Sequence, residues 1–225
     1  MIRGLVAVAL TLMTVGRATA ADGIQSIGSC QTIDKPGSYA LAKNLTAHGN
    51  CLVITASFVT VDLGGYTISG DGTGVGITNG GGGFNTQGEG PFEITIRNGT
   101  VTAFENGVHL DGRGHVVEAI RAVNNAAIGV HLVSASTRVP GDGVLRNNVA
   151  SRNGLVGLRA IQNGVPGGGW SVIGNVANSN GVGASGAGII VSCPSTLLNN
   201  VATGNGAADI VTDVACTRLG NSPAP

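Results

Sequence analysis

The stretch that decides the fold is repeated three times in the second half of the chain, as NVASRNG (148–154), NVANSNG (175–181) and NVATGNG (200–206). The copies start at nearly even intervals, and a short apolar segment follows each one. Upstream, the tetrapeptide GVHL occurs at 107–110 and again at 129–132, at a similar interval. Self-similarity at this period indicates a repeat protein whose units bury their apolar faces by stacking on their neighbours.

Each repeat has room for two or three short strands, and its corners are rich in Gly and Asn. Strand-like alternation is visible in FVTVDL (58–63) and FEITIR (92–97), and no helical period accompanies it. The unit is too short for a propeller blade, and it lacks the leucine-rich signature and the calcium-binding nonapeptide. The sequence therefore predicts an all-β fold, a right-handed parallel β-helix (solenoid) of about seven coils, each rising about 4.8 Å.

The recurring Asn residues have a structural explanation in such a fold. Asn tolerates the left-handed backbone conformation that a tight corner needs, and amides stacked coil upon coil hydrogen-bond one another. Ligand binding is the alternative, but repetition at every coil favours the structural role. We expect two rows, the first an internal ladder of Asn148, Asn175 and Asn200, the second a corner formed by Asn153, Asn180 and Asn205, each followed by Gly.

The composition excludes several classes of function. The 225 residues include 39 Gly but only seven aromatic and 24 charged residues, and the formal net charge is zero. The absence of a Gly-X-Y period and the abundance of aliphatic residues exclude collagen and plain disorder. No run of like charges provides a footprint for nucleic acid or an anionic membrane. We therefore expect no nucleic-acid partner, no cofactor, no metal ion and a monomeric protein.

The first twenty residues, MIRGLVAVALTLMTVGRATA, have the pattern of a secretory signal. Arg3 precedes an apolar stretch of about ten residues, and small residues at positions 18 and 20 complete a cleavage site. A membrane anchor is the alternative, but the stretch is well short of the roughly 20 residues that span a bilayer. We expect cleavage after Ala20, which leaves one β-helix domain at 21–225 that is secreted and is not a membrane protein.

Four cysteines remain after this cleavage, and their spacing forms two local pairs near the ends of the domain. Cys30 and Cys51 make up the first pair, and Cys193 and Cys216 make up the second. Metal binding is the rival interpretation, but there is no C-x-x-C and no His at ligand spacing. Because the separation within each pair is close to one coil, we predict two disulfide bonds, each joining an end coil to its neighbour.

Two runs near the start of the domain carry a family resemblance. IDKPGSYALAKNLT (33–46) and CLVITASFVTVDLGGYTISGDG (51–72) resemble the opening coils of secreted parallel β-helix repeat proteins, the pectate-lyase-like superfamily. The resemblance covers about residues 30–216 and implies the β-helix fold. Members with known roles mostly act on polysaccharides as lyases, glycosidases or uronan epimerases, and others are adhesins or surface proteins. The calcium-binding Asp cluster and the basic residue of lyase-type members are not visible here, so no catalytic residue is transferred.

One row of side chains is a candidate site. His109 and His131 occupy the same place in the two GVHL segments, and Arg159 occupies it in the next repeat. Strand alternation turns all three outward on adjacent coils, where mutual repulsion lowers the pKa of each imidazole and leaves it a neutral proton acceptor. With Asp111 as acid–base partner, the row is a candidate for proton abstraction beside a uronate carboxylate that Arg159 or Arg113 neutralises. The alternative is two exposed His in chance register, without chemistry.

Three segments longer than the repeat requires emerge beside this row, at 79–91, 133–142 and 161–169. Repeat proteins usually place such insertions on the binding face, so we predict a groove walled by loops. For the single Trp, stacking on a sugar ring and capping a corner between coils are both open. The expected lining residues are Glu89, Arg113, His115, Arg138, Asp142 and Trp170.

Two classes of function fit these features. The first is a non-catalytic secreted or surface β-helix that binds a polysaccharide or a partner along its flat sheets, which agrees with scarce charge and few aromatics. The second is a small polysaccharide lyase, uronan epimerase or glycosidase that works in the loop-walled groove. A structural or ice-adsorbing solenoid ranks last, because it would need a repeated Thr-x-Thr column and the motif occurs once, at 100–102.

Overall fold

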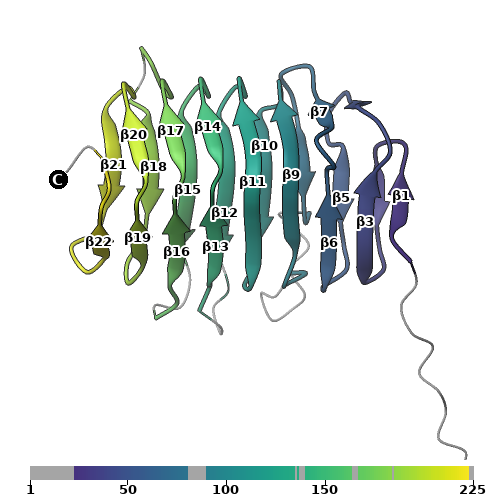
Figure 1. Ribbon diagram of the computed structural model, residues 1–225, viewed down its shortest axis with the longest axis horizontal. Helices are drawn as coiled ribbons and strands as arrows, with labels where there is room; N and C mark the ends of the chain where they lie inside the picture. Colours follow the sequence, from purple (N-terminus) through teal and green to yellow (C-terminus); the bar gives the residue numbers. More distant parts are fainter. Residues whose placement is uncertain are drawn as a thin grey trace, which may run out of the picture.

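The computed structural model describes residues 23–80, 90–134, 136, 140–163, 167–183 and 185–222. Within these ranges every regular element is a β-strand, 22 in all, and they form two parallel sheets. The protein is a β-solenoid of about seven turns, which confirms the fold predicted from the repeat. Figure 1 shows the strands stacked side by side, with the N-terminal and C-terminal coils at opposite ends. In the part of the chain that is described, no helix could cross a membrane.

One face of the solenoid is the eight-stranded sheet, to which each turn contributes one strand. All neighbouring strands in it are parallel and in register, so equivalent residues of successive coils lie side by side. In spatial order its strands are β2 (Gln31–Ile33), β5 (Leu52–Ile54), β8 (Val75–Thr78), β10 (Asn106–Asp111), β12 (Ile128–Ser134), β15 (Val156–Gln162), β18 (Ala187–Val191) and β21 (Ala208–Thr212).

The fourteen-stranded sheet supplies the other two faces, because it is bent along its length. Strands β9 and β11 pass through the bend at Asn98 and Ala119, which have φ values of 60° and 51°. The main arm contains β1 (Gln25–Ile27), β3 (Gly37–Leu41), β6 (Val59–Asp62), the first halves of β9 (Thr95–Thr102) and β11 (His115–Val123), β13 (Gly143–Arg146), β16 (Trp170–Ile173), β19 (Thr196–Leu198) and β22 (Thr217–Leu219). The short arm contains β4 (Leu45–Thr46), β7 (Thr67–Ser69), the second halves of β9 and β11, β14 (Val149–Ser151), β17 (Val176–Asn178) and β20 (Val201–Thr203).

The core is a set of aliphatic columns that run through the coils. In the eight-stranded sheet, Val108, Val130, Leu158 and Ile189 are paired in register and are fully buried. The residue after each of them points outward, as expected from strand alternation. Burial of apolar surface therefore runs the whole length of the rod rather than being concentrated at one centre.

Buried Asn side chains form two hydrogen-bonded ladders inside the coils. At Asn175, Oδ1 accepts hydrogen bonds from the backbone N–H and the Nδ2 of Asn148, at 2.9 and 3.0 Å. Its Nδ2 donates to the carbonyl oxygen of Leu145 and to Oδ1 of Asn200, both at 2.9 Å. The same pattern repeats along each row, so every amide satisfies backbone groups that the corner leaves unpaired. The first ladder runs Asn148, Asn175, Asn200 and Asn221, and the second runs Asn125, Asn153, Asn180, Asn205 and Asp209.

The structure corrects the roles assigned to Asn and Gly at the corners. The left-handed conformation belongs to the residue before a ladder Asn, such as Asn147 or Arg152, with φ values of 54° and 55°. The Gly that begins GVHL has another function. A Cβ on Gly129 would lie 2.7 Å from Nδ2 of Asn153 and 2.6 Å from the carbonyl oxygen of Gly157. This Gly is therefore needed because the ladder amide packs against it.

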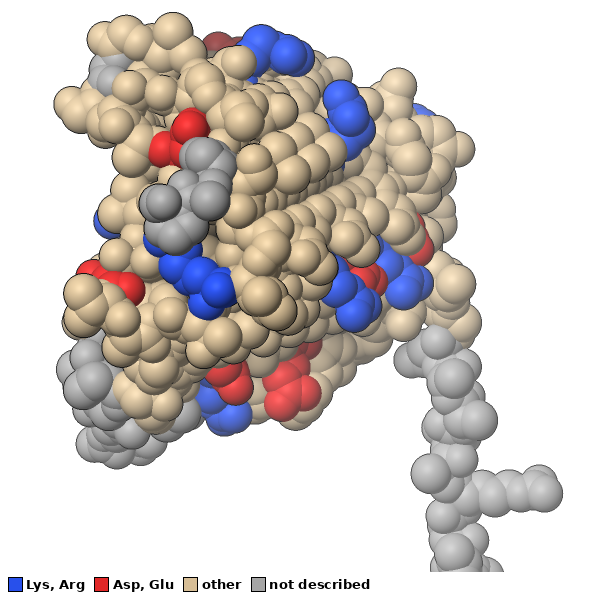
Figure 2. All heavy atoms as spheres, turned by 60° about the vertical axis from the view of Figure 1, so that its left-hand side comes forward, with Lys and Arg blue, Asp and Glu red and all other residues tan. Residues whose placement is uncertain are grey.

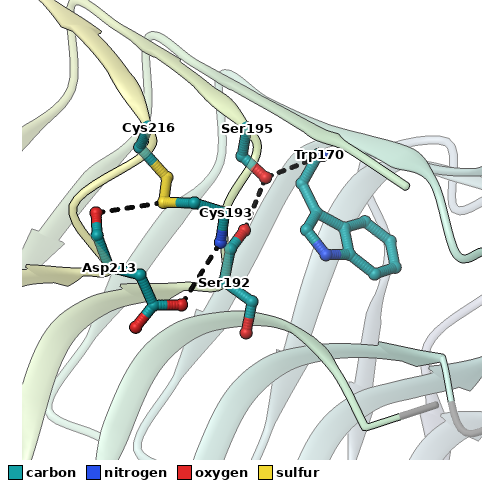
Figure 3. The surroundings of a disulfide bond; sticks show 6 residues. All are labelled: Trp170, Ser192, Cys193, Ser195, Asp213 and Cys216. Carbon is teal, nitrogen blue, oxygen red and sulfur yellow. Dashed lines mark hydrogen bonds between the residues drawn. A yellow bond between two sulfur atoms is a disulfide. The ribbon is translucent and has the colours of Figure 1, made fainter. Parts of the chain in front are cut away.

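The two predicted disulfide bonds, Cys30–Cys51 and Cys193–Cys216, are present, with Cα atoms 4.5 and 5.0 Å apart. Figure 3 shows the surroundings of the second, where the backbone N–H of Cys193 faces the carboxylate of Asp213 at 3.4 Å. Each bond joins an end coil to the next coil, where stacking on one side alone leaves strands least supported.

The first ladder provides a test of what stabilises the stack. In an Asn175→Ala variant, the backbone N–H of Asn148 and the carbonyl oxygen of Leu145 lose their hydrogen bonds to the Asn175 side chain, and the side-chain amide of Asn148 keeps only its bond to the carbonyl oxygen of Val117. We expect the free energy of unfolding to fall by about 3 kcal/mol, with a melting temperature roughly 10 °C lower. Thermal and urea unfolding measure the change. Asn163→Ala, at an exposed Asn, is the control, and equal stability of the two variants would contradict the ladder's importance.

Candidate functional site

His109, His131 and Arg159 lie on consecutive strands of the eight-stranded sheet and face outward together. His109 pairs with His131, and His131 pairs with Arg159, in the register of β10, β12 and β15. The two imidazole rings are stacked, with centroids 4.6 Å apart and planes inclined by 27°. The row continues to Thr78 on one side and to Ile190 on the other. The structure thus brings together the three residues that the repeat register predicted as neighbours.

The environment of this row keeps both imidazoles uncharged at neutral pH. Burial, and then the charges of His109 and Arg159, lower the pKa of His131 to about 3. The pKa of His109 is also lowered, by burial first and by Arg159 second. The row therefore presents one permanent positive charge, on Arg159, beside two neutral rings that can donate and accept hydrogen bonds.

Two polar atoms of the row are buried without a hydrogen-bond partner among the described residues. They are Nε2 of His131 and Nε of Arg159. A buried donor or acceptor left unpaired costs about 1 to 3 kcal/mol, and such groups are rare in folded proteins. Both atoms are covered by their neighbours, so a ligand on this face would meet the partly exposed remainder of the two side chains.

Asp111 lies two residues after His109 on the same face of β10, level with Val133 of the next strand. Its main chain is fixed by Asn79. The backbone N–H of Asp111 donates to Oδ1 of Asn79 at 2.9 Å, and its carbonyl oxygen accepts from Nδ2 at 2.6 Å. Asp111 is buried. Its role as an acid–base partner of the two His residues stays a prediction.

The side chain of His115 lies inside the coil, and the residue borders the hollow of about 230 Å³ that is described below. Its side chain is fully buried at the start of β11. Nδ1 accepts a hydrogen bond from the backbone N–H of Ile94 at 3.3 Å, and Nε2 donates to the carbonyl oxygen of Asp111 at 3.2 Å. Burial lowers the pKa of His115 to about 4, so the ring is a neutral structural link between two coils.

Trp170 is also a core residue. Only 2% of its surface is exposed, and its backbone N–H donates to Oγ of Ser195 at 2.9 Å (Figure 3). Of the two interpretations left open, stacking on a sugar ring is excluded because the indole is covered. Packing inside the coil is what the structure shows.

Two other predicted lining residues, Arg113 and Asp142, lie at the corner where the chain passes from the eight-stranded sheet to the main arm. Cζ of Arg113 is 4.4 Å from the ring centroid of Phe92, and Oδ1 of Asp142 accepts a hydrogen bond from the backbone N–H of Gly114 at 2.6 Å. Glu89 and Arg138 lie outside the described residues. The structure therefore groups Arg113 and Asp142 at this corner and not within the row of His109.

Two surface hollows lie past this corner, at the start of the main arm. One, of about 230 Å³, is lined by Asp142, Gly143 and Ser171 among others. The other, of about 340 Å³, lies near Trp170 and the Cys193–Cys216 bond. Sequence reasoning placed the groove on the eight-stranded sheet. These hollows lie on the neighbouring main arm. Part of each long segment lies outside the described residues, so the groove beside the row stays a prediction.

Sequence reasoning also missed a row of alternating charges on the main arm. Asp62, Arg97, Glu118 and Arg146 are paired in register on β6, β9, β11 and β13. Nε of Arg97 contacts Oδ2 of Asp62 at 2.9 Å, and Arg146 pairs with Glu118. Figure 2 shows basic and acidic side chains alternating along part of this face. The similar segments FVTVDL and FEITIR start 34 residues apart (92 − 58), whereas Asp62 pairs with Arg97 at a step of 35 (97 − 62), so aligning the two segments does not reveal the first pair. These charges compensate one another, unlike Arg159.

Neither a metal centre nor a similar protein identifies the function of the row. Among the described residues, no group of three or more His, Cys, Asp or Glu side chains is arranged to hold a metal ion. In comparisons with known proteins, no family model, curated protein or solved structure matches the chain. The function is therefore argued from the geometry of the row itself.

The lowered pKa values predict how stability depends on pH. The folded-state pKa of His131 is about 3, below the 6.5 of an unfolded chain, so the unfolded state binds more protons between these values. The free energy of unfolding should fall as the pH drops from 6.5 toward 3, by up to about 1.4 kcal/mol per pH unit for one His. His115 acts in the same direction.

The measurement is urea unfolding of the wild type and a His131→Gln variant from pH 7.5 to pH 4. Since Gln does not titrate, the variant should lose less stability in acid than the wild type. Superimposable pH profiles would show that His131 is not held neutral by the fold.

Proposed function

We propose that this protein is a secreted β-solenoid that binds a carboxylate-bearing polysaccharide along the outward face of its eight-stranded sheet, without chemical turnover. The observation that carries the proposal is the row of His109, His131 and Arg159, whose partly exposed side chains stand in register on three adjacent strands. The resemblance of the opening coils to the pectate-lyase-like superfamily supports a polysaccharide as the partner. The two disulfide bonds support an extracytoplasmic location.

The chemistry of the row suits a uronan. The guanidinium of Arg159 forms charge-assisted hydrogen bonds with a sugar carboxylate, and the neutral imidazoles exchange hydrogen bonds with sugar hydroxyls. Because the residues stand on adjacent strands about 4.8 Å apart, an extended chain that lies along the solenoid axis meets them in succession. Rigid strands hold these groups in place before binding, which reduces the entropy that association costs.

Catalysis by a lyase or an epimerase is the second candidate. A neutral imidazole beside Arg159 favours it, because these are a proton acceptor and a group that neutralises a uronate carboxylate. Against it, an imidazole with a pKa of about 3 is a weak base, whereas efficient general bases have pKa values near the working pH. The same low pKa does not impair hydrogen bonding, so binding is the function that the geometry supports best.

The test is binding of the purified protein to polygalacturonate and alginate, measured by calorimetry at pH 7 and pH 5. We expect Arg159→Gln to weaken binding at least tenfold, since it removes the charge that meets the carboxylate. Arg121→Gln, at an exposed Arg on the short arm, should bind as the wild type does. A bound carboxylate raises the pKa of the nearby imidazoles, so affinity should be higher at pH 5 than at pH 7.

The enzymatic alternative is followed in the same samples by absorbance of unsaturated uronate and by reducing ends. Binding without new absorbance or new ends supports the proposal. Absence of binding to every uronan would overturn it. Product formation that is lost in a His131→Ala variant would establish the lyase in its place.

A further inference from the structure

Two of the few aromatic side chains of this protein meet on its surface beside a basic group. The rings of Phe58 and Phe92 contact each other edge to face, with centroids 5.1 Å apart and planes inclined by 77°. Arg113 lies over Phe92, with its Cζ 4.4 Å from the ring centroid. Phe58, Phe92 and Arg113 form what we call the aromatic corner, where successive coils pass from the eight-stranded sheet to the main arm.

The conformation of Phe58 is unfavourable for a bulky residue. Its φ is 59°, in the left-handed region that side chains with a branched or aromatic group resist. In the strand register, the positions equivalent to Phe58 in the next two coils are Glu93 and Gly114, and both also have a positive φ. Gly removes this strain entirely, so the fold does not need an aromatic residue at position 58.

Burial does not explain Phe58 either. The side chain is 56% exposed, whereas Phe104 and Trp170 are buried in the core. Contact with Phe92 covers one part of the ring and leaves the rest in solvent. The ring of Phe58 is exposed, its backbone is strained, and the fold does not require it. We therefore infer that the ring has a role other than stabilising the fold.

We propose that the aromatic corner stacks against the apolar face of a pyranose ring. The corner would be a second contact for the polysaccharide that binds the row of His109, so this inference rests on the proposed function. Arg113 follows His109 by four residues, just beyond the end of β10. The corner therefore lies beside the axial path over the row, and a polymer that bends or branches at β10 would contact both. A flat aromatic surface matches the C–H-bearing face of a sugar, and Arg113 stays available to hydroxyl or carboxylate oxygens.

Variants at Phe58 separate a binding role from a structural one. Phe58→Asn removes the ring and introduces a residue that tolerates the left-handed conformation. It should bind polygalacturonate at least fivefold more weakly, with a melting temperature equal to or above that of the wild type. Phe58→Leu should also bind weakly, because it keeps apolar surface without a ring, whereas Phe58→Trp should retain binding. Leu155→Ala removes an exposed apolar side chain at another corner and is the control.

The outcomes distinguish this inference from the proposed function. If Phe58→Asn and Phe58→Leu bind as the wild type does while Arg159→Gln loses binding, the aromatic corner is not a contact and the proposed function stands. If Phe58→Asn lowers the melting temperature along with binding, the residue is structural and the inference fails. If the wild type binds no uronan, both proposals are overturned together.

Discussion

Every feature of this protein depends on the hydrogen bonding of one coil to the next in strict parallel register. A typical coil, of 21 to 35 residues, cannot bury its own apolar surface, so each one gains its stability from the coils on either side. The Asn ladders extend this dependence to the corners, where the ordinary strand pairing is interrupted. The side-chain amide of a ladder Asn accepts hydrogen bonds from one coil and donates hydrogen bonds to another. Buried polar groups that would otherwise oppose folding are thereby satisfied within the stack.

Register also determines how function can be arranged. A side chain on one coil has a fixed neighbour on the next, so chemistry on the surface of this protein is organised in rows parallel to the axis. On the main arm such a row alternates in charge and neutralises itself between Asp62 and Arg146. On the eight-stranded sheet, His109, His131 and Arg159 have no acidic counterpart in register. The unequal composition of these two rows is the reason for placing the proposed acidic polysaccharide on the eight-stranded sheet.

The fold, the Asn rows, the disulfide pairs and the stacking of His109 on His131 were all accessible from the sequence. Each follows from counting residues between similar segments, because in parallel, in-register coils two residues that are one repeat apart in the sequence lie next to each other in space. The burial of His115 and Trp170 was not accessible. Both stand at the start of a strand just after an irregular segment, where the alternation of inward and outward residues begins anew and cannot be extrapolated.

The second ladder ends in a way that gives the solenoid a defined length. Its last member is Asp209, whose Oδ1 accepts from the backbone N–H and the side-chain amide of Asn205 at 3.1 and 2.8 Å. A carboxylate can receive the hydrogen bonds of the row but has no amide hydrogen to pass onward. Asp209 is therefore a terminator for a chain of directional bonds. A further coil, whether from the same polypeptide or from another copy, would bring an acceptor against a negative charge, so the residue that completes the stack also discourages its continuation.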